Sequence, residues 1–138
     1  MIVLDTSGVL AALDDSGRMH TAARAALESD EGPLLLSPFV LQEIDYLLGR
    51  KNVDAELLFL REVAGGVYQI EPLSGEEIGL AADVVERYRD MEVGLADASV
   101  IVIAARAGTT RILSLDERHF RAMRPLRGRA FTLLPADA

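Results

Sequence analysis

Five short apolar runs alternate with longer helical patterns along the chain, and this alternation restricts the possible folds more than any other feature. The runs that we predict to be strands cover residues 2–4, 34–36, 67–70, 111–115 and 130–134. Strands that alternate with helices form βαβ units, and the resulting parallel sheet is covered by helices on both faces. We therefore predict an α/β fold, a three-layer α/β/α sandwich with a central, mainly parallel sheet.

Capping residues and breakers locate the helices between these strands. Thr6 and Ser7 are placed to cap a first helix, Ser37 precedes a proline at the first helical position, and Ser74 with Glu77 matches a capping box. Gly49 is expected to end the third helix. The predicted helices cover residues 9–13, 20–29, 38–48, 53–64, 75–91 and 97–107.

Length and composition indicate one domain, residues 1–138, with a core of its own. Cysteine is absent, which excludes disulfides, thiolate zinc sites and cysteine nucleophiles and suits a reducing compartment. The longest nearly continuous apolar run covers residues 98–105, far short of a membrane span, and the first residues lack the pattern of a secretory signal. We expect a cytoplasmic protein that does not bind membranes.

The net charge of −8 argues against a protein that coats nucleic acid nonspecifically. Residues 106–129 differ from the rest because they carry seven arginines and only two acids, a local charge of +5. Arginine suits bidentate contacts to phosphate, so this segment could meet an anionic partner. A solvated surface on which these arginines balance acidic neighbours explains the local positive charge equally well.

Four of the twenty-two acids stand in unusual settings. Asp5 and Asp116 each follow an apolar strand directly, and parallel strands place ligands at this edge of a sheet. Glu43 shares a helical stripe with apolar residues, and Asp97 opens the most apolar helix of the chain. A carboxylate directed toward a core is costly unless it is paired or binds a metal.

Convergence of these four acids would require a cation or raised pKa values. Oxygen ligands suit Mg²⁺ or Mn²⁺, and the scarcity of histidine argues against zinc, copper and iron. Carboxylate-held magnesium typically supports phosphoryl transfer. Each acid taken singly also has a plain structural explanation, since three of them could cap helices and Glu43 could pair with an arginine.

Several neighbours of these acids need separate interpretations. Thr6, Ser7 and Ser114 could orient the carboxylates or metal-bound water, although capping is the commoner role for the first two. Asp45 is turned about 200° from Glu43 on a helix and cannot share its direction. His119 more plausibly packs or contacts a phosphate than acts as a general acid.

Four stretches of the chain resemble the PIN-domain ribonucleases, in particular VapC-type toxins of bacterial toxin–antitoxin pairs. The stretches are IVLDTSGVLAAL, SPFVLQEIDYLL, LADASVIVIAAR and ILSLDERHF. The four family acids match Asp5, Glu43, Asp97 and Asp116, and the family hydroxyls near the metal match Thr6 and Ser114, a position that is often threonine.

This resemblance implies an endoribonuclease that depends on Mg²⁺ or Mn²⁺ and cuts by in-line attack of water, leaving a 5′-phosphate and a 3′-hydroxyl. Asp5 and Asp97 would be direct metal ligands, while Glu43 and Asp116 would bind metal directly or through water and help to deprotonate the nucleophile. The resemblance also implies a homodimer and a cognate antitoxin. We expect Arg118 and Arg121 to assist RNA binding.

Two other functions remain open at this point. A phosphatase of the haloacid dehalogenase type also begins with an Asp after an apolar strand, but it needs a second Asp where this chain has Ser7. A module of the same fold could bind RNA or a protein through its arginines without cutting, although the four acids argue against this.

Overall fold

The computed structural model describes residues 1–138 and contains one sheet in which all five strands are parallel. The strand order is β3-β2-β1-β4-β5. The strands are β1 (Ile2–Leu4), β2 (Leu34–Leu36), β3 (Gln69–Ile70), β4 (Arg111–Leu113) and β5 (Thr132–Leu134). The prediction of a mainly parallel sheet is confirmed. β1 and β2 have the predicted bounds, whereas β3, β4 and β5 are shorter than predicted.

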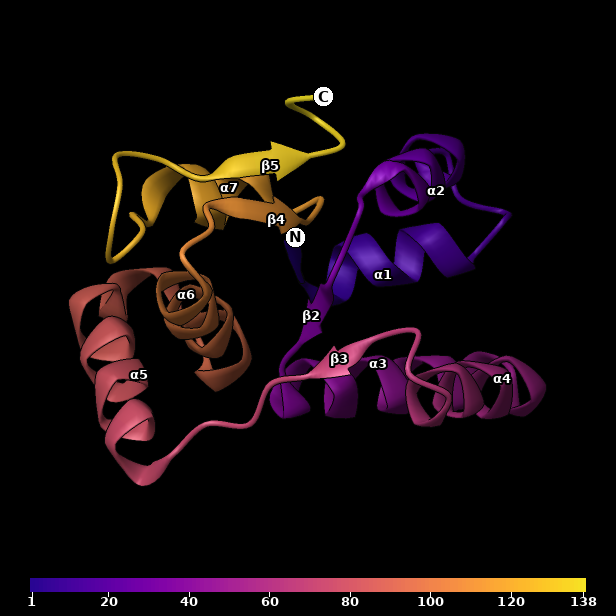
Figure 1. Ribbon diagram of the computed structural model, residues 1–138, viewed down its shortest axis with the longest axis horizontal. Coiled ribbons are helices and arrows are strands. Elements are labelled where there is room, and N and C mark those ends of the chain that lie inside the picture. Colours follow the sequence, from indigo (N-terminus) through magenta and orange to yellow (C-terminus); the bar gives the residue numbers. More distant parts are fainter.

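Seven α-helices and one 3-10 turn connect and cover these strands. Figure 1 shows α1 to α4 on one side of the sheet and α5 to α7 on the other, so the three-layer sandwich is confirmed. The helical elements are α1 (Thr6–Leu13), α2 (His20–Ser29), α3 (Pro38–Lys51), α4 (Val53–Ala64), α5 (Gly75–Arg87), η1 (Arg89–Met91), α6 (Leu95–Ala107) and α7 (Glu117–Ala122). None of these helices is both long and apolar enough to cross a lipid bilayer.

The strand order reverses at β1, which lies between β2 and β4. The chain leaves β1 for β2 and β3 on one side, and it later returns to β4 and β5 on the other. Open parallel sheets bind ligands outside the carboxyl ends of the strands at such a reversal. Residues that follow β1 and β4 therefore lie where a site is expected.

Two predicted helix boundaries are wrong, the start of the first helix and the end of the third. Helix α1 already begins at Thr6, so Thr6 and Ser7 lie inside the helix instead of capping it. Helix α3 continues through Gly49 to Lys51, and Gly49 lies against Glu56 of α4. A Cβ on Gly49 would lie 2.8 Å from Glu56 Oε2.

The core fills both faces of the sheet with aliphatic side chains. β1 is completely buried. Eight residues of α6 are also buried, Ala96 and residues 98–104, and the half-exposed Asp97 lies between them. A helix that is apolar on nearly all sides must be covered on nearly all sides. α6 therefore provides a rigid base for the acid that it carries.

Candidate active site

Asp5 follows β1 and is only 5% exposed. Its Oδ2 accepts hydrogen bonds from Ser114 Oγ at 2.7 Å and from Ser7 Oγ at 3.0 Å. Burial, with a smaller contribution from the negative charge of Asp97, raises the pKa of Asp5 to about 6, although the hydrogen bonds from Ser114 and Ser7 lower it. Asp5 makes no side-chain cap to α1, so the simple capping explanation fails for this residue.

The two serines also fix the loop that follows β4. Ser7 Oγ accepts the backbone N–H of Leu115 at 2.9 Å, and Ser114 Oγ accepts that of Asp116 at 2.9 Å. Each hydroxyl therefore joins the Asp5 carboxylate to the backbone of the β4–α7 loop. Asp116 is consequently held at the same edge of the sheet as Asp5.

Glu43 enters the site from α3. Thr6 Oγ1 donates a hydrogen bond of 2.6 Å to Glu43 Oε1, which ties the first turn of α1 to the middle of α3. The predicted alternative, an ion pair of Glu43 with an arginine, does not occur in the structure. Asp45 points elsewhere, as expected, because it faces Glu56.

A buried serine pair sets the position of α3 relative to α6. Ser37 Oγ and Ser99 Oγ are 2.6 Å apart, and Ser99 Oγ also donates to the carbonyl oxygen of Ala96 at 2.6 Å. Ser37 caps α3 by accepting the N–H of Phe39. Glu43 and Asp97 are thus carried by two helices whose relative position is fixed by hydrogen bonds.

Asp97 is electrostatically coupled to the other three acids. Burial raises its pKa; His119 opposes the shift, and the negative charges of Asp116 and Glu43 add to it. Asp97 likewise raises the pKa of Asp5. Asp97 lies in the first turn of α6, whose N-cap is Gly94, so it is not the capping residue. The four sequence-predicted acids therefore form one interacting group centred on Asp97.

Asp116 and His119 bind each other at the start of α7. Asp116 Oδ1 accepts the backbone N–H of His119, so this acid does cap a helix, and Asp116 Oδ2 lies 2.7 Å from His119 Nδ1. The other ring nitrogen, Nε2, lies 3.0 Å from the carbonyl oxygen of Met91. Both partners are acceptors, so both contacts need a protonated nitrogen. The hydrogen bond to Asp116 raises the pKa of His119 accordingly.

The four acids fit a hydrated divalent cation better than a closed protein cage. No three of the Asp, Glu and His side chains approach one another closely enough to enclose an ion by themselves. Mg²⁺ is typically held by one or two carboxylates and keeps several waters. Burial and the negative charges of neighbouring acids raise the pKa values of Asp5 and Asp97, and a nearby cation stabilises carboxylates in such a setting.

Arg118 and Arg121 have different surroundings although both belong to α7. Arg118 lines an open hollow of about 430 Å³ together with Asp90, Met91, Glu92 and His119, and it forms no ion pair.

The guanidinium of Arg121 binds both carboxylate oxygens of Asp137, at 2.6 and 2.8 Å, and also contacts Glu117. Arg121 thereby fixes the last turn of the chain.

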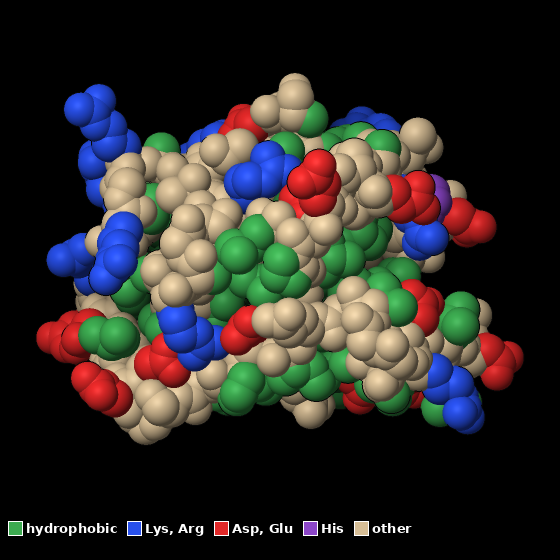
Figure 2. Space-filling view, in the orientation of Figure 1, with side chains coloured by type: hydrophobic (Ala, Val, Ile, Leu, Met, Phe, Trp, Pro, Cys, Tyr) green, Lys and Arg blue, Asp and Glu red, His purple; other side chains and the backbone are tan.

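The remaining arginines of residues 106–129 divide in the same way. Arg106 binds Glu71 and Glu77, and Arg111 binds Asp30 at the opposite end of β4 from Asp116. The arginines between α7 and β5 form no ion pair: Arg124, Arg127 and Arg129. Figure 2 shows basic side chains gathered at the upper left, over that segment. Some arginines of this segment thus neutralise acids of the same chain, and the others are free of acidic partners.

The chain is similar to known proteins of one family. The family model described as PIN domain matches residues 2–125. The chain belongs to the PIN-domain family. Ribonuclease VapC26 of Mycobacterium tuberculosis is 43% identical to this PIN domain over 97% of the chain and 100% of the relative, which places the chain in the VapC group. The predicted family is therefore confirmed.

A solved structure shares the fold. The crystal structure of VapC20 of Mycobacterium tuberculosis, a toxin that cleaves the sarcin–ricin loop, superimposes with a TM-score of 0.79. The match covers 93% of this PIN domain and 100% of VapC20 at 20% identity. The haloacid dehalogenase alternative is wrong, because the family match contradicts it and Ser7 binds Asp5 where that class needs a second acid.

Sequence reasoning missed part of the hydrogen-bonding framework. It assigned capping as the commoner role of Ser7, and it gave no role to the pair formed by Ser37 and Ser99. It also gave His119 no connection to Asp116. An Asp followed three residues later by His at a helix start is a local signal for the last contact, whereas the serine pair joins residues 62 positions apart and has no local signal.

Proposed function

We propose that this chain is an endoribonuclease, the toxin of a toxin–antitoxin pair, and that it hydrolyses RNA phosphodiester bonds with the help of Mg²⁺ or Mn²⁺. The observation that carries the proposal is the coupling of Asp5, Glu43 and Asp116 to Asp97 at the strand-order reversal. Family membership supports the reaction class, since the relative VapC26 is a ribonuclease.

In this proposal the residues have distinct tasks. Asp5 and Asp97 would hold the cation, and Glu43 and Asp116 would help to hold it or accept a proton from the attacking water. The bound cation would supply a nucleophile at neutral pH and neutralise charge on the phosphate. Thr6, Ser7 and Ser114 orient the carboxylates, so that they do not turn away from one another.

The substrate is proposed to reach the acids past Arg118. This arginine has no acidic partner, lies beside His119 and lines the hollow next to Asp116, so it is available for a phosphate oxygen. Arg121 was expected to assist RNA binding, but its guanidinium is already committed to Asp137 and Glu117. We therefore assign RNA contact to Arg118 in preference to Arg121.

Cleavage of RNA by the purified protein tests the enzymatic proposal. We expect cutting of ribosomal RNA with Mg²⁺ or Mn²⁺, none with EDTA, and products that carry a 5′-phosphate and a 3′-hydroxyl. Asp97→Asn should abolish cutting while circular dichroism and the melting curve show a folded chain. Asp15→Asn, which changes an exposed acid outside the site, is the matched control. Equal cutting by the Asp97 variant and the parent would refute the proposal.

The partners need separate tests. Co-expression with the product of the adjoining reading frame should inhibit cutting if that product is the cognate antitoxin. Light scattering on the purified chain should report a mass twice that of one chain if the protein forms the homodimer expected of VapC-type toxins. A chain that stays monomeric at all concentrations would exclude the homodimer without affecting the nuclease assignment.

A further inference from the structure

Tyr46 is the only exposed aromatic side chain of the protein. The chain contains four phenylalanines, three tyrosines and no tryptophan. The other six rings are buried or half-buried, whereas Tyr46 is 58% exposed. A large ring left in solvent on a helix that already has a buried face is not needed for the core. Tyr46 is therefore available for a ligand.

The position of Tyr46 on α3 connects it to the candidate active site. Tyr46 lies three residues after Glu43, and Arg50 lies seven residues after Glu43. The three side chains therefore form a row along one face of the helix. With a rise of about 1.5 Å per residue, this row extends about 10 Å from the acid. Glu43 is held at the site end of the row by Thr6.

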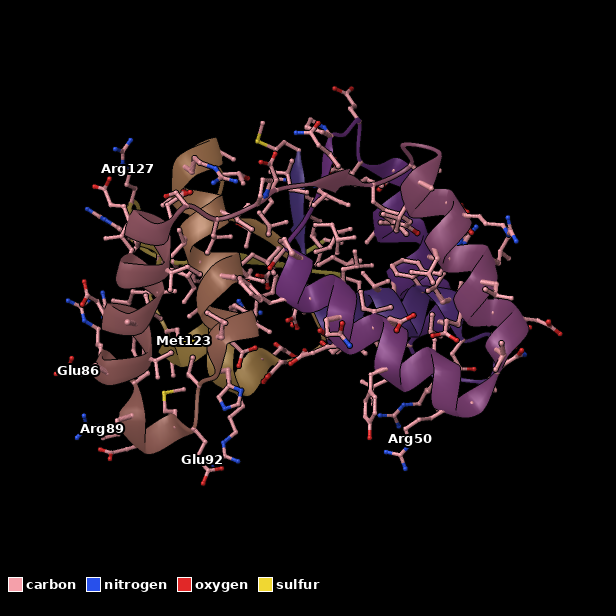
Figure 3. All side chains as sticks on the ribbon, turned by 90° about the horizontal axis from the view of Figure 1, so that it is seen from below. Arg50, Glu86, Arg89, Glu92, Met123 and Arg127 are labelled. Atoms are coloured by element: carbon pink, nitrogen blue, oxygen red, sulfur yellow. The ribbon has the colours of Figure 1, made fainter.

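Arg50 contacts Tyr46 and adds a positive charge beside its ring. Its guanidinium carbon lies 5.5 Å from the centroid of the Tyr46 ring, in a cation–π arrangement, and it forms no ion pair with an acid. Figure 3 shows Arg50 and Glu92 pointing to the same side of the molecule, from α3 and from the segment after η1. Arg118, close to Glu92 in the hollow, therefore approaches the acids from α7 while Arg50 lies on the α3 side.

We infer that Tyr46 and Arg50 form a base-stacking subsite for unpaired RNA, one to two nucleotides from the phosphate that is cut. This inference rests on the proposed ribonuclease function. Aromatic rings and guanidinium planes are the groups on which proteins stack bases of single-stranded segments and loops. The subsite would hold an unstacked base against the ring while Arg50 contacts the base face or the adjoining phosphate. Duplex RNA, whose bases are stacked on each other, cannot use it.

Fluorescence of 2-aminopurine tests the stacking directly, because stacking on an aromatic ring quenches the base. The probe is a short single-stranded RNA of mixed sequence that carries several 2-aminopurines, titrated with the protein in EDTA so that it stays intact. We expect quenching by the parent chain, and affinity lowered about tenfold or more with loss of quenching for Tyr46→Ala. Tyr46→Phe should behave like the parent, because it keeps the ring.

Two further variants sharpen the result. Arg50→Ala should weaken binding less than Tyr46→Ala and lower the salt dependence of binding by about one phosphate contact. Leu58→Ala, which truncates a side chain of α4 that is 62% exposed, should bind as the parent does. The same probe annealed to its complement should bind equally to the parent and to Tyr46→Ala.

The outcomes separate this inference from the function on which it rests. Parent protein that neither binds nor cuts RNA would remove the proposed function and with it the subsite. Parent protein that cuts RNA, with Tyr46→Ala binding and quenching equally well, would overturn the subsite alone. A Tyr46→Ala chain that keeps its RNA affinity but loses affinity for its co-expressed partner protein would also overturn it and assign the ring to protein docking.

Discussion

Ser114 Oγ lies 2.7 Å from Asp5 Oδ2 and donates a hydrogen bond to it, while the same oxygen accepts the N–H of Asp116. One hydroxyl thus connects two acids from neighbouring strands, and it is buried, so water cannot replace it easily. The orientation of Asp5 depends on this contact and on the weaker one from Ser7 at 3.0 Å.

Removal of the Ser114 hydroxyl should therefore weaken the site without dismantling it. We expect Ser114→Ala to lower Mg²⁺ affinity and the rate of RNA cutting by about 10- to 100-fold, the usual effect of losing a group that orients a metal ligand. Calorimetric titration with Mg²⁺ and initial cleavage rates measure the two effects. Ser114→Thr keeps the hydroxyl and should stay close to the parent; if both variants lose activity equally, the hydroxyl is not the cause.

The stability of the metal-free protein should depend on the protonation of Asp5. Burial raises its pKa to about 6, above the 3.8 of an unperturbed Asp, so the folded state binds this proton more tightly than the unfolded state. The resulting stability is fully present below the unfolded value and is lost as the pH rises through about 6. Asp5→Asn, which stays neutral, should be more stable than the parent by up to about 3 kcal/mol at neutral to alkaline pH.

Denaturant unfolding across pH checks this expectation. The difference between Asp5→Asn and the parent should disappear near the unperturbed pKa, and Mg²⁺ should stabilise the parent more than the variant. The control Asp15→Asn should show no such pH-dependent gain. An Asp5→Asn chain that is less stable than the parent at every pH would contradict the assigned cause.

Gly8 sets the distance between α1 and β4. A Cβ at this position would lie 2.4 Å from the carbonyl oxygen of Leu113 and 2.6 Å from its carbonyl carbon, both of which belong to the backbone. Gly8→Ala should force α1 away from the sheet and cost about 1–3 kcal/mol or more. Gly79→Ala in α5, where a Cβ meets nothing within 4 Å, should instead stabilise by about 0.5–1 kcal/mol. Similar unfolding midpoints for the two variants would contradict the packing argument.

Asp45 and Glu56 face each other between α3 and α4 without a cation. The hydrogen bond and the charge of Asp45 raise the pKa of Glu56, and Asp45 Oδ1 is buried with no hydrogen-bond partner. The pair is therefore less stabilising above the unfolded pKa of Glu56 than below it. Asp45→Asn supplies an amide donor and should raise the melting temperature at neutral pH, with a smaller gain in acid. Glu31→Gln, an exposed change elsewhere, is the control, and a lowered melting temperature for Asp45→Asn would refute this account.

The two arginines of α7 should respond differently to truncation. Arg121→Ala removes the bidentate contact to Asp137 and should lower the melting temperature, an effect that fades in strong acid because the pKa of Asp137 is about 2. Arg118→Ala should leave the melting temperature unchanged and weaken RNA binding, with a smaller salt dependence. Thermal melts and RNA titrations of both variants measure these effects. If Arg118→Ala lowered the melting temperature and Arg121→Ala weakened RNA binding, the roles assigned to the two arginines would be reversed.

The fold was predictable because its signals are local. The buried strands β1, β2 and β4 follow from short apolar runs, and the capping box formed by Ser74 and Glu77 locates the start of α5. Some helix boundaries were not predictable, because a capping residue or a glycine does not always mark a helix end. Gly49 has the sequence signature of a helix end, but α3 continues past it to Lys51.

The site was predictable in its acids and less so in what supports them. A carboxylate after an apolar strand, as in Asp5, or inside the most apolar helix, as in Asp97, is unusual enough to be noticed in the sequence. The role of a serine cannot be recognised in the sequence in the same way, because its hydroxyl serves caps, turns and long-range bridges equally well. The same holds for charges: only the three-dimensional contacts distinguish the paired Arg121 from the unpaired Arg118.

The hydroxyl that orients Asp5 comes 109 positions later in the chain, and the one that bridges α3 to α6 comes 62 positions after its partner. A growing polypeptide on the ribosome therefore lacks an ordered catalytic centre until its last quarter has left the exit tunnel. A ribonuclease built in this way has no complete group of oriented acids while its own synthesis is still short of this segment.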